Sequence, residues 1–233
     1  MPKISYLVTC CSETDTLDRL LARLEVCVKG TTDEVVILLD TAYSQATLEI
    51  TNKYDKPNPN IRLELHALAN NYGGHKNYGV EKCSGDFVFQ IDGDEMLPDY
   101  LLGENLHALL DANPTIEAYA IPRINAWHGL TEAHAQRWGW SIDTSPTYNR
   151  IRAAWPDYQW RLFKRDYPRI EFKKRLHERI DGFKTYVILP AEEDFALYHD
   201  KTIEVQIATN QRYNKDFTTD ENRGISDEKV KHD

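Results

Sequence analysis

The residues with the clearest chemical potential are the three carboxylates of Asp92-Gly93-Asp94-Glu95. They directly follow the mostly apolar run Phe87–Ile91, so they stand where a buried strand is expected to end. Carboxylates repel one another and resist burial, and a divalent cation relieves both costs. Mg²⁺ and Mn²⁺ accept oxygen ligands and often complete their shell with substrate phosphates. The segment therefore predicts a metal site for a phosphorylated substrate; the alternative is a solvated acidic turn.

A second concentration of functional residue types is aromatic and basic. All five tryptophans lie between residues 127 and 160, and basic residues outnumber acidic ones between 150 and 184. Exposed tryptophans together would form a stacking platform for a sugar ring or a base. The alternative is a helical insert that packs onto the sheet, with the basic run as an ordinary solvated face.

Composition sets limits on the protein class. The chain has 233 residues, 41% of them hydrophobic, which fits one large domain or two small ones. A net charge of −9 argues against passive binding to nucleic acid or to an anionic membrane. No run of 18 apolar residues occurs, so no membrane span is expected. The four cysteines match neither a zinc ribbon nor a disulfide scaffold; buried thiols and a cytoplasmic location are the expectation.

Strand-like and helical segments alternate through the first half of the chain. Strands are expected at 4–9, 34–39, 61–66 and 86–91, and helices after Ser12, at 46–54, at 75–82 and after Pro98. This order predicts a mostly parallel sheet with helices on both faces. Ligands bind such sheets outside the carboxyl ends of the strands, where Thr9, Asp40 and Asp92 stand.

The pattern changes after residue 115. Strands are expected at 117–124, 158–164 and 186–189, and the stretch from residue 215 is polar.

Several motifs resemble glycosyltransferase family 2, the inverting enzymes of the GT-A fold. The matching segments are Thr9–Glu13, the strand ending at Asp40, Asn71–Asn77 and Ser84–Glu95. Later segments are similar to the branch that contains lipopolysaccharide-core β-glucosyltransferases: Trp160–Arg165, Leu176–Glu178 and Leu197–His199. The resemblance spans about residues 3 to 205.

The resemblance implies an α/β GT-A fold, a Rossmann-like and mostly parallel sheet flanked by helices with a C-terminal acceptor-side region. Residues 1–214 would form a single domain. Its half 1–113 would bind the nucleotide sugar, its half 114–214 would face the acceptor, and 215–233 would be a polar tail.

The resemblance also implies a metal and donor site. Asp94 would hold Mn²⁺ or Mg²⁺, helped by His199, and Asp92 would contact the donor ribose or a metal-bound water. Glu95 would support Asp94 or face water. The alternative for His199 is an ordinary half-buried histidine.

Four further residues would bind the nucleotide, three at its base and one at its phosphates. Thr9, Glu13 and Asp40 would line a base pocket that suits uracil, hence a UDP-sugar, and Lys76 would lie near the phosphates. The alternatives are a helix cap at Asp40 and an exposed lysine at 76.

An inverting transfer also needs a base for the acceptor hydroxyl. The E-D pair of many family members is absent, and His177-Glu178 is the nearest substitute. Glu178 is the preferred base and Asp143 the second choice. His177 would orient Glu178 or touch a phosphate. The alternative for Glu178 is a salt bridge within its basic segment.

These residues together predict an inverting, metal-dependent glycosyltransferase. Trp127, Trp138 and Trp140 would contact an acceptor that can be anionic, such as a core glycan, a lipid-linked glycan or a DNA base. A nucleotidyltransferase of the same fold is the first alternative, although Cys10–Glu13 lacks the glycine-rich basic loop of that class. The second is a non-catalytic protein that binds sugar or nucleic acid. Donor sugar and oligomeric state stay open.

Overall fold

Four parallel strands form the first half of the sheet. The computed structural model describes residues 1–55, 57–143 and 152–222. The strands are β1 (Ile4–Cys10), β2 (Glu34–Asp40), β3 (Ile61–His66) and β4 (Phe87–Asp92), in the order β3-β2-β1-β4. Every residue of β2 is buried, as expected for a central strand that helices cover on both faces. The parallel sheet predicted from the sequence is confirmed.

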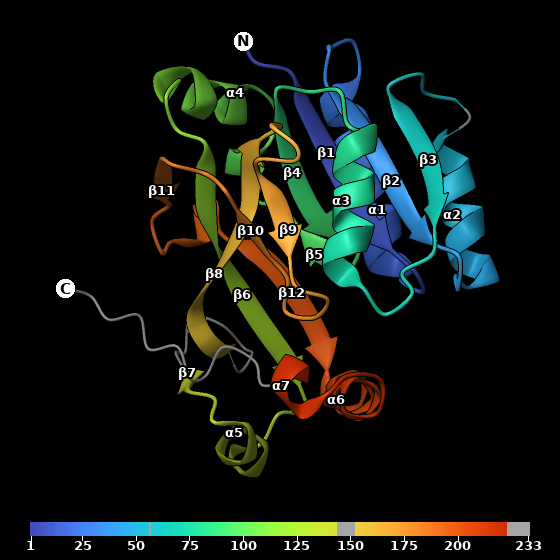
Figure 1. Cartoon of the computed structure of the whole chain (residues 1–233), viewed down its shortest axis with the longest axis vertical. Helices are drawn as coiled ribbons and strands as arrows, with labels where there is room; N and C mark the ends of the chain where they lie inside the picture. The colour runs from blue at the N-terminus through green and yellow to red at the C-terminus, as the bar shows by residue number, and fades with distance from the viewer. Residues whose placement is uncertain (56, 144–151, 223–233) are drawn as a thin grey trace.

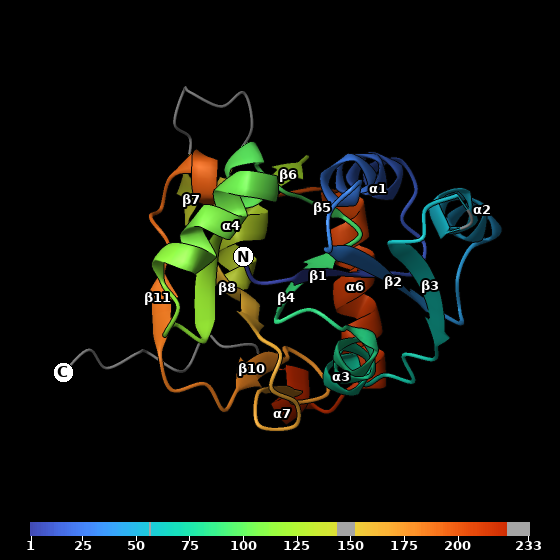
Figure 2. The same ribbon diagram turned by 90° about the horizontal axis from the view of Figure 1, so that it is seen from above.

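Helices cover both faces of this half (Figures 1 and 2). Figure 2 shows α1 (Asp15–Val28) and α2 (Gln45–Asp55) on one face and α3 (Tyr72–Lys82) on the other. The leucines expected on the inner side of α1 are fully buried. The predicted cap at Ser12 is wrong, because α1 begins at Asp15 and no side chain caps it. α3 begins three residues earlier than expected, since Oδ1 of Asn71 accepts the backbone N–H of Gly74 at 3.0 Å.

The second half extends the sheet with mixed strand directions. After β4 the order continues through β8 (Arg152–Lys164), β6 (Ala118–His128), β12 (Leu197–Thr202) and β5 (Glu95–Met96). β8 is antiparallel to both β4 and β6, whereas β6 and β12 are parallel. β11 (Tyr186–Ile188) also pairs with β6, and β7 (Ile142–Asp143) pairs with β8. The three strands expected after residue 115 are all present, two of them longer than predicted. β12 was missed because His199 takes its second buried position and charged residues follow, so its sequence lacks the alternation of apolar and polar residues that marks a strand.

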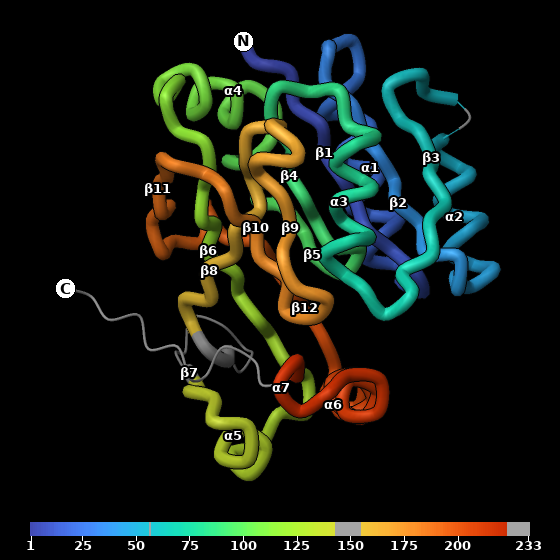
Figure 3. Tube along the Cα trace, viewed as in Figure 1, coloured from blue at the N-terminus to red at the C-terminus, as the bar shows by residue number. Residues whose placement is uncertain are grey.

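The remaining elements border the sheet. The hairpin of β9 (Glu171–Lys173) and β10 (Arg179–Asp181) lies beside α3 (Figure 3). The side-chain amide of Asn77 in α3 bonds the backbone of Phe172 in β9. The 3₁₀ turn Asp99–Leu101 precedes α4 (Gly103–Ala112), and a second 3₁₀ turn spans Glu193–Phe195.

Three helices lie at the carboxyl edge of the sheet: α5 (Glu132–Trp138), α6 (Ile203–Asp216) and α7 (Thr219–Asn222) (Figure 1). The polar tail expected from residue 215 differs from the structure up to residue 222, because α6 continues to Asp216 and Phe217 is buried. Within the described ranges, no helix has both the length and the apolar composition needed to cross a bilayer.

Candidate functional site

Asp92 is the centre of a buried polar network at the end of β4. Its Oδ1 accepts hydrogen bonds from Thr9 Oγ1 at 2.8 Å and Gln90 Nε2 at 2.8 Å, and lies 3.1 Å from Lys76 Nζ. Its Oδ2 lies 2.5 Å from Nη2 of Arg161. Burial alone would raise the pKa of Asp92, but Arg161 and Lys76 hold that pKa well below its usual range. Asp92 is therefore ionised, and both of its oxygens are engaged by protein groups.

Glu95 anchors the cations of this network. Its side chain is 0% exposed, so of the two roles expected for it, support of Asp94 or exposure to water, the second is wrong. Its Oε1 lies 2.7 Å from Arg161 Nη2 and 3.0 Å from Arg123 Nη1, and its Oε2 accepts the backbone N–H of Asp92 at 3.0 Å. Arg123 is also paired with Asp157 at 2.6 Å. Buried charges are tolerated here because each one is paired and hydrogen-bonded.

Asp94 lies beside His199 and Lys201. The short pairing of β5 with β12 places His199 opposite Glu95, and Nε2 of His199 lies 3.3 Å from Oδ2 of Asp94. Asn125 Oδ1 lies 2.7 Å from the other ring nitrogen of His199, so Nε2 is held toward Asp94. Lys201 Nζ lies 2.9 Å from the same oxygen of Asp94. Burial would raise the pKa of Asp94, but His199 and Lys201 keep that pKa below its usual range.

Asp94 and His199 form a partial donor set for a divalent cation. A carboxylate and an imidazole suit Mn²⁺, and Mg²⁺ commonly takes few protein ligands and several from water and phosphate. No group of three or more His, Cys, Asp or Glu side chains suited to a metal occurs in the part of the chain that the structure describes. The residues present fit a cation whose shell is completed by a bound phosphate and water. Lys201 competes with that cation for the same oxygen of Asp94.

Lys76 joins Asp92 to Glu178. Its side chain is only 4% exposed, so the exposed-lysine alternative is wrong. Nζ lies 3.1 Å from Asp92 Oδ1 and 2.6 Å from Glu178 Oε1. Glu178 is thus in a salt bridge, but its partner comes from α3 rather than from its own basic segment.

Close backbone packing brings the loop that carries Glu178 against α3. The N–H of Tyr72 donates to the carbonyl of Arg175 at 2.8 Å. A Cβ atom on Gly73 would lie 2.3 Å from the carbonyl oxygen of Lys174, so only glycine fits at this contact.

Glu13 and Asp40 lie at the same edge but bond to backbone groups. Oε2 of Glu13 accepts the N–H groups of Cys11 at 2.7 Å and Ser12 at 3.0 Å. Oδ1 of Asp40 accepts the N–H groups of Ala42 at 3.3 Å and Leu68 at 3.0 Å. Both carboxylates shape the loops after β1 and β2; their contact with a nucleotide base stays a prediction.

The tryptophans do not form one open platform. Trp127 is 7% exposed and packs with Leu130 and Ile203, which agrees with the helical-insert alternative. Its ring centroid lies 5.8 Å from that of His199 and 5.2 Å from that of Trp140. Trp138 lies 4.9 Å from Trp140, and these two rings are half-buried. A row of rings therefore leads away from the Asp94 region.

Two predicted residues are not joined to this network by the described contacts. His177 adopts φ 52° in the loop before β10, and its ring lies 6.2 Å from that of Tyr213 in α6. Burial lowers the pKa of His177, so a neutral imidazole is favoured there. The side chain of Asp143, the second candidate base, lies outside the described residues, and only its place in β7 is given.

Apart from Lys76, the cations of the site were not predicted from the sequence. Arg161, Arg123 and Lys201 neutralise the three acidic residues, yet none was assigned a role. A signal was present for Arg161, which is a charged residue between the apolar residues Trp160 and Leu162 of a strand.

Comparison with known proteins agrees with this geometry. The family model for glycosyl transferase family 2 matches residues 5–198. The lipopolysaccharide core biosynthesis glycosyltransferase LpsC of Rhizobium meliloti (strain 1021) is 28% identical over 125 residues, which are 53% of this chain and 43% of that protein. The chain thus spans less than half the length of this relative.

Solved structures of TarS from S. aureus share the fold. The crystal structure of TarS 1–349 has a TM-score of 0.57 at 16% identity, over 85% of this chain and 60% of that chain. The TarS 1–349 complex with UDP-GlcNAc has a TM-score of 0.54 at 16% identity, over 85% of this chain and 58% of that chain. The curled sheet flanked by helices is the one found in GT-A glycosyltransferases.

Proposed function

Because the chain belongs to glycosyl transferase family 2, we propose that it transfers a sugar from a nucleotide-diphosphate sugar to an acceptor hydroxyl with inversion. The observation that carries the proposal is the cluster of three half-buried carboxylates, Asp92, Asp94 and Glu178, with the buried Lys76 at the carboxyl edge of the parallel sheet. A UDP-sugar is the favoured donor, since a TarS structure of the same fold was solved with UDP-GlcNAc.

In this proposal each side chain has a distinct task. Asp94 and His199 hold Mn²⁺ or Mg²⁺, which supplies positive charge to the leaving diphosphate. Asp92 is fixed by Thr9 and Arg161. It accepts a further hydrogen bond from a hydroxyl of the donor ribose or from a water. Lys76 offers positive charge to the phosphates.

Glu178 acts on the acceptor. Its Oε1 is held by Lys76, so Oε2 is the oxygen that takes the acceptor proton. The acceptor oxygen then bonds to the anomeric carbon as the bond to the diphosphate breaks on the opposite face. Deprotonation by a positioned carboxylate contributes typically about 10²- to 10⁴-fold to the rate.

The four cysteines of the chain are compatible with a reducing compartment. Cys10, Cys11, Cys27 and Cys83 are all unpaired, and burial raises the pKa of Cys83 to about 12. We propose that the enzyme works in the cytoplasm, where thiols stay reduced.

The test is a thermal-shift screen of UDP-, GDP-, dTDP- and CMP-linked sugars, each with and without Mn²⁺. A ligand that binds only the native state raises the melting temperature. We expect a Mn²⁺-dependent shift with UDP-sugars in the wild type and in Asp111→Asn, an exposed carboxylate of α4. Asp94→Asn should lose the shift. No shift with any nucleotide sugar, or an undiminished shift in Asp94→Asn, would refute the donor site.

A further inference from the structure

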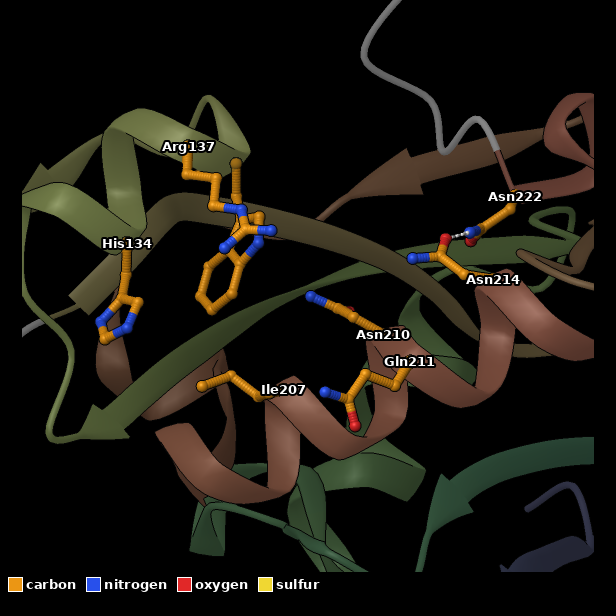
Figure 4. Close-up of a pocket in the computed structure, with 8 residues that line it drawn as sticks. His134, Arg137, Ile207, Asn210, Gln211, Asn214 and Asn222 are labelled. Carbon is orange, nitrogen blue, oxygen red and sulfur yellow. Dashed lines mark hydrogen bonds between the residues drawn. The ribbon is translucent and has the colours of Figure 1, made fainter.

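A cleft of about 470 Å³ lies between α5 and α6, beyond the Asp92–Asp94 network (Figure 4). Four of its lining side chains are primary amides: Asn210, Gln211, Asn214 and Asn222. Figure 4 shows the first three projecting from one side of α6 toward α5. An amide offers a donor and an acceptor at once, which matches a sugar hydroxyl that must do the same.

Both helices also contribute aromatic or apolar side chains to the cleft. Trp138 of α5 and Ile207 of α6 line the cleft, and the rings of Trp138 and His134 stack with centroids 5.4 Å apart. Sugar rings bind proteins through hydroxyls at their rim and through C–H groups that pack on aromatic or aliphatic surfaces. Arg137 also lines the cleft, and no carboxylate does among the described residues.

Packed aromatic rings link the cleft to the proposed transfer site. The row of rings runs from His199, which lies beside Asp94, through Trp127 and Trp140 to Trp138. In addition, α6 follows β12 directly, with Thr202 Oγ1 accepting the N–H of Val205 at the start of the helix. The cleft and the Asp94 region are thus joined by packed rings, of which Trp127 is buried, and by the direct connection from β12 to α6.

We propose that the cleft between α5 and α6 binds uncharged, hydroxyl-rich sugar residues of an oligosaccharide acceptor. Its link to transfer rests on the proposed function, whereas saccharide binding itself does not. The amides favour neutral hydroxyls over phosphate, because four of the eight lining side chains are uncharged amides and only Arg137 carries a permanent charge.

Three of the four amides are held by hydrogen bonds within the protein. Asn214 Oδ1 accepts from Asn222 Nδ2 at 2.5 Å, and Asn210 Oδ1 accepts from Gln206 Nε2 at 2.7 Å. A preorganised lining lowers the entropic cost of binding.

The experiment measures saccharide binding directly, by saturation-transfer NMR on the full chain. The probes are neutral trisaccharides of glucose, galactose, mannose or N-acetylglucosamine, with glucose 6-phosphate as the charged probe. Each is tested alone and with UDP and Mn²⁺ present.

Two variants form a matched pair. Gln211 and Gln136 are both exposed helical glutamines, on α6 and α5, and only Gln211 lines the cleft. Gln211→Ala should weaken binding about 3- to 10-fold, the effect of one lost hydrogen bond, and Gln136→Ala should leave it unchanged. Trp138→Ala should weaken binding about 10-fold or more.

The outcomes separate the two proposals. Trisaccharide binding that falls in Gln211→Ala and Trp138→Ala supports the cleft even if no nucleotide sugar binds. Binding of no trisaccharide in either condition overturns the proposal. Equal binding by Gln211→Ala and wild type places the saccharide elsewhere, and binding of the phosphorylated probe alone shows an anion site; either result overturns it.

Discussion

Lys76 provides the sharpest test of the network, because it is the shared cation of two carboxylates. Lys76→Met keeps the length of the side chain and removes the charge. The change deletes one ion pair at 3.1 Å and one at 2.6 Å from a side chain that is 4% exposed. A hydrogen bond to a charged group contributes about 1.5 to 3 kcal/mol, and removing one partner of a buried pair costs about 3 to 5 kcal/mol.

The expected loss is at the lower end of that range. Asp92 keeps Thr9, Gln90 and Arg161, and Glu178 is exposed enough to be hydrated in part. We therefore expect the free energy of unfolding to fall by about 3 kcal/mol, and the melting temperature by roughly 10 °C for a chain of this size. Urea unfolding without metal or nucleotide measures this directly.

The control is Lys82→Met on the same helix. Nζ of Lys82 lies 4.8 Å from the ring centroid of Tyr78 and bridges no carboxylates in the described structure. Its loss should cost about 1 kcal/mol or less. A free energy of unfolding for Lys76→Met within 1 kcal/mol of the wild-type value would refute the bridge between Asp92 and Glu178. It would also refute the proposal that Lys76 positions Glu178.

Three further predictions concern the base, the loop that carries it and the pH dependence of folding. Glu178→Gln should lower kcat about 10²- to 10⁴-fold while UDP-sugar affinity stays within about 2-fold; an active variant would exclude Glu178 as the base. Gly73→Ala should cost about 1 to 3 kcal/mol in urea unfolding and lower activity, because the new methyl group pushes Lys174 and its loop off α3; unchanged activity would mean that this contact does not position Glu178. Burial, together with the nearby His66 ring, lowers the pKa of His75 from 6.5 to about 4. The unfolded chain then binds the proton more readily below pH 6.5, so this group should lower the free energy of unfolding by about 2 kcal/mol between pH 7.5 and pH 5. His75→Gln should lose that part of the pH dependence, and an identical profile would contradict the assignment.

The first half of the fold was predictable because its signals are local. The strands are continuous apolar runs, and the helices carry apolar faces with a period near 3.6 residues. β3 has the expected bounds, and α1 buries the expected leucines. The cap at Ser12 failed because the carboxylate of Glu13 bonds the N–H groups that precede the helix instead.

The site was only partly predictable because its charge balance is non-local. The acidic segment at 92–95 is visible in one stretch of sequence, but its cations come from α3, β6, β8 and β12. A single sequence does not show which strands pair with one another in the sheet. For the same reason the tryptophans appeared as one platform, whereas the fold buries Trp127 and leaves Trp138 at the edge of a cleft.

The late position of β12 has a consequence for how an active molecule is made. Asp94 and His199 are 105 residues apart in the chain. At a synthesis rate of about 5 to 20 residues per second, the ribosome adds the second residue roughly 5 to 20 seconds after the first. During that interval the parallel half can collapse, but Asp94 lacks both His199 and Lys201. If Asp94 and His199 hold the donor's cation as proposed, donor affinity arises only when β12 enters between β6 and β5. A chain that stops short of residue 202 would then contain the acidic motif and be inactive.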